Sequence, residues 1–363
     1  METGGHLQPD RKYTTKCTDL KTHLHTISYL LQCIFCNNVR QCIHFPVMGR
    51  VLLTRFFFGF LAWMGVVILV FFMIHAIPGD PVDNLLGEQV QPTDKEAFRK
   101  RLHLDESLPS QFVRYLSSIV DGSLGYSYTN SNATVVQCIR EVLPYTLELA
   151  LFAMAFALAL AIPLGIVAAV HRGSWLDTLA MMLAVMGVSL PAVWVGPLLI
   201  YLFVIKWPLL PPPGSPYAGI VGLILPSVTL GLALCAMLAR MMRSSMARQL
   251  QEDYVRTARA KGLSETRVLF VHALRNALIP VITVVGMQFG ALLSGAVIVE
   301  KIYARPGIGT LLLRAILQRD YPVVQGTVLI VALLVIIVTQ LTDGIYALID
   351  PRLRSSTHKG FWS

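Results

Sequence analysis

The sequence predicts an all-α polytopic membrane protein with six transmembrane helices. The 363-residue chain is 55% hydrophobic, only 14% of its residues are charged, and its mean hydropathy is +0.61. This is too apolar for an ordinary soluble domain. Six intervals hold about 20 mostly apolar residues each, the length that crosses a bilayer. The net charge of +9 comes from bases that flank these intervals, which is typical of membrane orientation. We therefore expect membrane lipid around the chain and no nucleic-acid partner.

Residues 1–47 precede the first apolar interval and are expected to be a poorly ordered leader or a mis-annotated start. Met48 opens a short basic stretch directly before that interval, as many inner-membrane proteins do. The leader contains a group of potential zinc ligands, Cys33, Cys36, Cys42 and His44. No second clean pair completes the spacing of a zinc site, so we expect no bound metal.

The six apolar intervals lie at about 56–77, 145–170, 176–205, 220–238, 281–299 and 327–349. Basic residues stand before the first interval and after the last, so both termini are expected in the cytoplasm, with 355–363 as a tail. Prolines should end the first helix at residue 78, kink the second at Pro163 and interrupt the third at Pro191 and Pro197. Small residues in the fifth interval predict tight packing against other helices: Gly286, Gly290, Ala291 and Gly295.

The polar segment 78–140 is predicted to lie on the external side. Its pattern predicts a helix over 94–102 with Thr93 as the N-cap, a second helix over 111–120, and a turn at 121–125. A run of three prolines makes residues 206–219 a stiff external loop, and residues 300–325 form another external segment.

The cytoplasmic segment 240–280 carries eight basic residues against three acidic ones. An ordinary positive-inside loop would explain this charge alone. However, apolar residues recur at helical spacing in two clusters, one around Val255 and one over 268–274, with Gly262 between them. This pattern predicts two short amphipathic helices joined at a glycine, which can take the left-handed conformation that ends a helix. Their apolar stripe lies outside the membrane, so we expect another protein to dock there.

No catalytic or nucleotide-binding motif is found in the sequence. A G-x-x-x-x-G-K-[ST] loop is absent, so the chain does not bind ATP through a P-loop of its own, and no enzyme activity or bound cofactor is expected. Ionisable residues within or beside the spans are functional candidates by default because buried charge is costly: His75, Glu148, Asp177, Glu300 and Asp343. Most lie near span ends, where an interfacial position explains them. Asp343 and Glu148 leave open a stand-alone proton-coupled transporter.

The segment Asp253–Leu263 (DYVRTARAKGL), followed by HALRNA at 272–277 and by Pro280, resembles the coupling loop of ABC-importer permeases, in particular the dipeptide/oligopeptide/nickel family. Against the general signature E-A-A-x-x-x-G-x9-I-x-L-P, the matching residues are Ala258, Gly262 and Leu274, and the differing ones are Arg256, Thr257, His272 and Arg275. Further matching stretches lie at 77–81, 240–246, 306–309, 319–325 and 350–352, so the resemblance covers 48–354. Arg305 stands where the family often has Trp.

The resemblance implies a type I ABC-importer permease over 48–354, in the cytoplasmic (inner) membrane, importing dipeptides or oligopeptides, with nickel or glutathione as alternatives. It also implies three kinds of protein partner: a homologous second permease subunit, two ATPase subunits that carry the ATP and Mg, and an extracytoplasmic solute-binding protein. The residues expected to couple to the ATPase are Tyr254, Val255, Arg256, Thr257, Ala258, Arg259, Ala260, Lys261 and Gly262. The resemblance identifies no substrate-binding residue.

Overall fold

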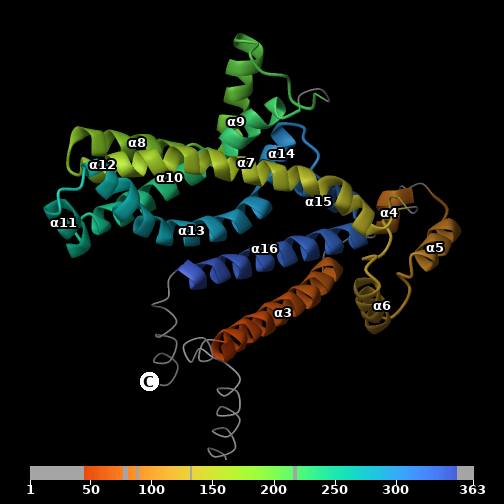
Figure 1. Ribbon diagram of the computed structural model, residues 1–363. Helices are drawn as coiled ribbons and strands as arrows, with labels where there is room; N and C mark the ends of the chain where they lie inside the picture. The colour runs from red at the N-terminus through yellow and green to blue at the C-terminus, as the bar shows by residue number, and fades with distance from the viewer. Residues whose placement is uncertain (1–44, 77–80, 87–89, 131–132, 216–218, 350–363) are drawn as a thin grey trace, which may run out of the picture. The chain divides into compact units, whose positions relative to one another are not determined.

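A computed structural model of the chain describes residues 45–76, 81–86, 90–130, 133–215 and 219–349 (Figure 1). These ranges are helices joined by short connections, with one isolated β-bridge between Tyr126 and Thr134. The chain divides into two compact units, Met1–Phe60 and Leu61–Ser363, and the packing below concerns the second. The predicted leader with its zinc ligands and the predicted tail lie outside the described residues.

The α-helices in chain order are α3 (Phe45–Ala76), α4 (Pro81–Leu86), α5 (Pro92–Arg101), α6 (Leu108–Val120), α7 (Val135–Val170), α8 (Trp175–Ser189), α9 (Ala192–Ile200), α10 (Ile224–Gln249), α11 (Asp253–Ala260), α12 (Glu265–Arg267), α13 (Leu274–Gly295), α14 (Val297–Ile302), α15 (Ile308–Gln318) and α16 (Tyr321–Ile349). A π-helical turn follows α9 (Tyr201–Lys206), another joins α12 to α13 (Val268–Ala273), and a 3-10 turn precedes α10 (Val221–Leu223).

Five helical stretches in the described part of the chain are long and apolar enough to cross a membrane, and a bent pair makes a sixth span. The five are Phe56–Ala76, Val135–Val170, Val221–Gln249, Glu265–Leu293 and Tyr321–Thr342. The bent pair is Trp175–Gly187 with Ala192–Lys206, at an angle of 93°. Leu190 is extended between the two (φ −93°, ψ 115°), because a residue before proline is disfavoured in the α conformation. The predicted break at Pro191 is therefore confirmed, whereas Pro197 lies inside α9 and breaks nothing.

Several helices begin earlier than the sequence predicted. Helix α7 starts at Val135 because Thr134 and Gln137 form a capping box, which satisfies backbone groups of its first turn. Helix α5 starts at Pro92 after the N-cap Gln91, so the expected cap at Thr93 is wrong. Helix α6 starts at Leu108, before the predicted 111. These starts lie outside the long apolar intervals, so hydropathy did not mark them.

Helices α7 and α10 form the most extensive packing contact, and both present small residues to it (Figure 1). Ala157 and Ala161 of α7 and Ala239 of α10 are fully buried. A Cβ added at Gly231 would lie 2.7 Å from the Ala153 carbonyl oxygen, so only glycine permits this backbone approach. Small residues at such crossings are the usual basis of helix association in a bilayer.

The predicted tight packing of the fifth span is confirmed at two of its four positions. A Cβ at Gly286 would clash with the Thr342 side chain, and one at Gly290 would meet Val335 at 3.3 Å, so α13 lies close against α16. Ala291 is exposed in this single chain, so its predicted packing stays a prediction. The surroundings of Gly295 lie outside the described side chains.

On the predicted external side, α6 rests on the end of α3. Phe71 stacks with Tyr115 at a centroid distance of 5.9 Å and meets Phe112 edge-on at 5.0 Å. His75 Nε2 lies 2.9 Å from Gln111 Oε1. Burial raises the pKa of Tyr115 to about 12. His75, a functional candidate in the sequence, therefore joins a membrane helix to the external segment.

We expect Gly286→Ala to lower the free energy of unfolding by about 1–3 kcal/mol, because the new methyl group forces α13 away from Thr342. Gly65→Ala is the matched control, since a Cβ there meets nothing within 4 Å. Denaturant unfolding of both variants in lipid or detergent measures the difference. Equal effects of the two substitutions would contradict the close α13–α16 contact.

Candidate functional site

The segment 240–280, which is predicted to be cytoplasmic, folds as predicted into helices joined at Gly262. Helix α10 ends at Gln249, and α11 follows after a short turn. At the end of α11, Gly262 has φ +77° and its N–H donates to the Arg259 carbonyl (2.9 Å), while the Leu263 N–H donates to that of Ala258 (3.4 Å). This is the Schellman arrangement, which satisfies the last carbonyls of the helix and requires a left-handed residue. The glycine therefore sets a sharp, defined angle between α11 and α12.

The inner face of α11 is covered by the chain itself. Val255 is fully buried and Ala258 is 6% exposed, and both belong to one apolar cluster with Met246 of α10 and Val268 of the π-helical turn. The expectation that a docking protein covers this apolar stripe is therefore wrong for Val255 and Ala258. Amphipathic spacing revealed that a face is buried, but α10 and residues 268–273 already supply the apolar surface for it.

The outer face of α11 holds the other seven predicted coupling residues, all of them exposed: Tyr254, Arg256, Thr257, Arg259, Ala260, Lys261 and Gly262. Arg259 binds Glu265 through two contacts, at 2.7 and 3.2 Å, and so connects α11 to α12 across the glycine turn. The Tyr254 hydroxyl donates to Gln249 Oε1 of α10 at 2.6 Å. The outer face is thus fixed relative to α10 and α12, and its role in coupling stays a prediction.

Asp177 pairs with Arg243 and joins α8 to α10. The guanidinium donates from Nε at 2.5 Å and from Nη2 at 2.6 Å, and the Gly173 N–H donates to the same carboxylate at 3.0 Å. The Asp177 side chain is 7% exposed. Two-point Arg–carboxylate contacts fix geometry as well as charge. We assign this candidate a structural role between the two helices.

Glu300 and Glu148 both have partners on other elements. Glu300 is 1% exposed; it accepts from the Thr146 hydroxyl at 2.6 Å and from the Thr310 N–H at 3.1 Å. The Thr146 oxygen in turn accepts from the Ile308 N–H, which joins α7, α14 and α15. Glu148 accepts from Arg305 at 2.9 Å. The Asp343 side chain lies outside the described residues, so the prediction made for it stays untested.

Asp320 is a buried carboxylate that the sequence analysis did not single out. It is 2% exposed and accepts from the Ser127 hydroxyl and from the backbone N–H groups of Tyr128, Thr129 and Val323. It therefore fixes the external segment to the start of α16. An Asp two residues before a Pro, in front of a long apolar run, is an N-cap signal that could have revealed it.

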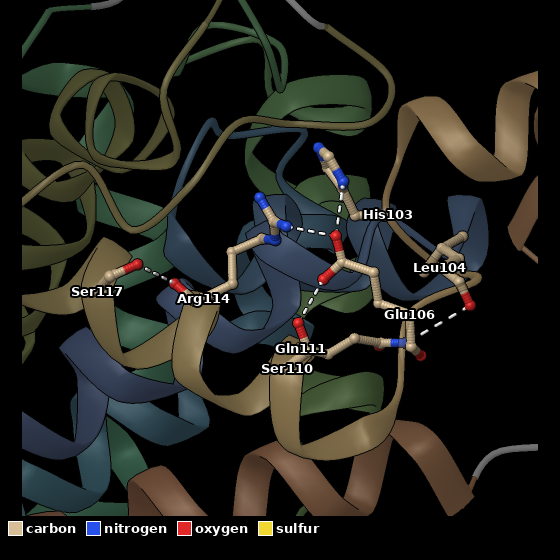
Figure 2. Close-up of polar contacts among 7 residues, drawn as sticks. All are labelled: His103, Leu104, Glu106, Ser110, Gln111, Arg114 and Ser117. Atoms are coloured by element: carbon tan, nitrogen blue, oxygen red, sulfur yellow. Dashed lines mark hydrogen bonds and ion pairs between the residues drawn. The ribbon is translucent and has the colours of Figure 1, made fainter.

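A second external cluster orders the turn between α5 and α6 (Figure 2). The Glu106 carboxylate accepts from the Ser110 hydroxyl at 2.8 Å and also contacts Arg114 and His103. The hydrogen bond from Ser110 is the main cause that holds the pKa of Glu106 below its usual value. Gln111 donates to the Glu106 carbonyl at 2.9 Å, which closes the turn.

The described residues contain no group of three or more potential metal ligands. Helical spans and buried polar contacts between helices together define a multi-pass membrane protein. Residues 161–355 match the family "Binding-protein-dependent transport system inner membrane component", and residues 48–150 match the N-terminal domain of the same components. The chain belongs to this family, the permease subunits of ABC transporters, as its resemblance indicated.

The chain covers nearly the whole length of three curated relatives. The dipeptide transport system permease of Escherichia coli strain K12 is 41% identical over 322 residues (80% of this chain, 95% of that protein). The di/tripeptide transport system permease of Pseudomonas aeruginosa is 43% identical over 319 residues, with the same coverage. The glutathione transport system permease of Pectobacterium atrosepticum is 43% identical over 289 residues (80% and 94%).

We expect Arg243→Met to destabilise the protein by about 3 kcal/mol, because it leaves the Asp177 carboxylate buried without its cation. The double variant Asp177→Leu/Arg243→Met should recover most of this loss, since no unpaired charge remains. Arg240→Met, on an exposed arginine of the same helix, is the control and should have little effect. Denaturant unfolding of these variants, of Asp177→Leu alone and of the wild type measures the coupling, and additive effects of the two single substitutions would exclude it.

Proposed function

We propose that this chain is one permease subunit of an ATP-driven importer of short peptides in the cytoplasmic membrane. The observation that carries the proposal is the identity of 41–43% to dipeptide and di/tripeptide permeases, over 95% of those proteins. Glutathione is the second candidate substrate, because a glutathione permease is equally similar. A stand-alone proton-coupled transporter is a weaker alternative, since Glu148 is engaged by Arg305.

The partners follow from what the chain lacks. Its sequence has no P-loop, so in this proposal two separate ATPase subunits bind ATP and Mg below the membrane. A second, homologous permease completes the pathway, and an extracytoplasmic solute-binding protein delivers the substrate. Both termini and the 240–280 segment then face the cytoplasm, in agreement with the basic charge of that segment.

In this proposal the outer face of α11 receives the motion of the ATPase. Buried Val255 and Ala258 anchor α11 to α10 and to the π-helical turn before α13, and Arg259–Glu265 restrains the glycine turn. A displacement of α11 therefore moves α10 and α13 with it instead of bending the loop. Such rigid-body motion of packed helices is a common way to alternate access to a site.

The test of this function is uptake by vesicles that contain the chain with its second permease, both ATPases and the binding protein. We expect ATP-dependent accumulation of labelled dialanine or glutathione that stops when either ATPase is omitted. The matched control replaces ATP with an imposed pH gradient. Accumulation that follows the pH gradient and needs no ATPase would refute the proposal and favour the proton-coupled alternative.

A bulky residue on the outer face of α11 should disturb coupling to the ATPase without disturbing folding of this chain. We expect Ala260→Trp to lower transport about tenfold, the effect of losing roughly 1.4 kcal/mol of contact, with unfolding unchanged because Ala260 is exposed. Thr266→Trp, on exposed α12 in the same segment, is the matched control. ATP hydrolysis and uptake are measured on the same vesicles. Equal losses of transport in the two variants would mean that the ATPase does not contact the outer face of α11 at Ala260.

A further inference from the structure

A cavity of about 710 Å³ opens beside the N-terminal half of α7, where Glu148 lies. Its walls come from α7 (Tyr145, Glu148, Phe152), from the proline-rich loop around Pro211–Gly214, and from residues 303–306 after α14. The volume falls in the range of about 300–1,000 Å³ that is usual for small-molecule sites. Aromatic and proline walls with a few converging polar groups are also typical of such sites.

Two opposite charges meet at the wall of this cavity. Arg305 donates from Nη2 to Glu148 Oε2 at 2.9 Å, and its guanidinium lies over the Tyr145 ring at 5.6 Å. The Arg305 side chain is only 16% exposed, whereas that of Glu148 is 51% exposed. The arginine is therefore held in place, and the carboxylate remains open to a ligand.

The guanidinium of Arg305 has donors that its ion pair does not use. The contact with Glu148 uses Nη2 alone. The Nε is buried without a hydrogen-bond partner among the described residues, so it is closed to a ligand in the cavity. A carboxylate in the cavity could instead accept from the terminal guanidinium N–H groups that Glu148 leaves unused.

We propose that this cavity binds short peptides with free termini, with Arg305 binding the C-terminal carboxylate and Glu148 the N-terminal ammonium. The inference rests on the proposed peptide-import function and deepens it by naming specificity residues. The adjacent cation and anion match a zwitterion. A simple anion would gain nothing from the partly exposed Glu148 carboxylate, which would repel it. The apolar walls accept different peptide side chains without selecting among them.

The test is direct binding of labelled dialanine to the complete permease–ATPase assembly in nanodiscs, without the binding protein. We expect Arg305→Gln to weaken dialanine binding about ten- to a hundredfold, the usual effect of losing hydrogen bonds to a charged group. Dialanine amide, which lacks the carboxylate, should bind weakly and equally to the wild type and to this variant. Arg305→Lys keeps the charge but loses the planar guanidinium fork, and its affinity should fall between those of the wild type and Arg305→Gln.

The second arm concerns the ammonium. Glu148→Gln should weaken binding of dialanine but leave that of N-acetyl-dialanine unchanged. Arg314→Gln, on an exposed arginine of α15 that does not line the cavity, is the matched control and should bind like the wild type. Assembly with the ATPase subunits is measured for every variant, because Arg305 and Glu148 also join two parts of the fold.

Three results would overturn the assignment. They are no saturable binding of dialanine by the wild type, equal losses for the acid and the amide, and loss of binding-protein docking with dialanine binding unchanged. The last result would mean that the cavity receives a segment of that protein. ATP-dependent uptake by the wild type, measured on the same assembly, separates the two hypotheses. If uptake is retained while any of these three results is found, only the assignment of the cavity as a peptide site is rejected. If no peptide tested is taken up, the proposed function is rejected.

Discussion

The close crossing of α7 and α10 is the constraint on which the rest of the structure depends. A bilayer gives no hydrophobic drive for helices to associate, so close contact of small residues must hold them. Ala157, Ala161 and Gly231 permit that contact. Helix α10 also packs on α8 and α13 and then continues to Gln249, which carries the α11 segment. The position of the outer face of α11 therefore follows from contacts between the apolar helices.

Buried carboxylates reinforce this packing at several separate places. Asp177 joins α8 to α10, Glu300 joins α7, α14 and α15, and Asp320 joins the external segment to α16. Each of these three accepts two or more hydrogen bonds or a charge-assisted pair. A buried charge with such partners costs far less than an unpaired one. Their chemistry is that of structural connections between helices, which removes the need to assign them a proton pathway.

Sequence reasoning worked where a local pattern decides the structure, and it did not work where distant surfaces decide it. Hydropathy located the spans, the rule for residues before proline located the break at Pro191, and Gly262 marked the end of α11. Helical spacing showed that Val255 lies on a buried face, but no local pattern could show that Met246 and Val268 cover that face. The partners of Arg305 and Asp320, Glu148 and Ser127, lie 157 and 193 residues away in the chain. Local spacing in the sequence therefore cannot predict these contacts.

The segment 240–280 and the cavity are connected through the helix pair α7 and α10. Helix α7 contributes Tyr145 and Glu148 to the cavity and packs along α10, which leads to α11. The opposite wall, at 303–306, is joined to α7 by the Thr146–Glu300 and Arg305–Glu148 contacts. Because both walls are held to the same helix, the proposed motion of α11 would move the cavity without opening the charge pair. A pocket whose charges are already in place loses little entropy on binding. The proposed peptide site can therefore keep its selectivity while its access to the two sides of the membrane changes.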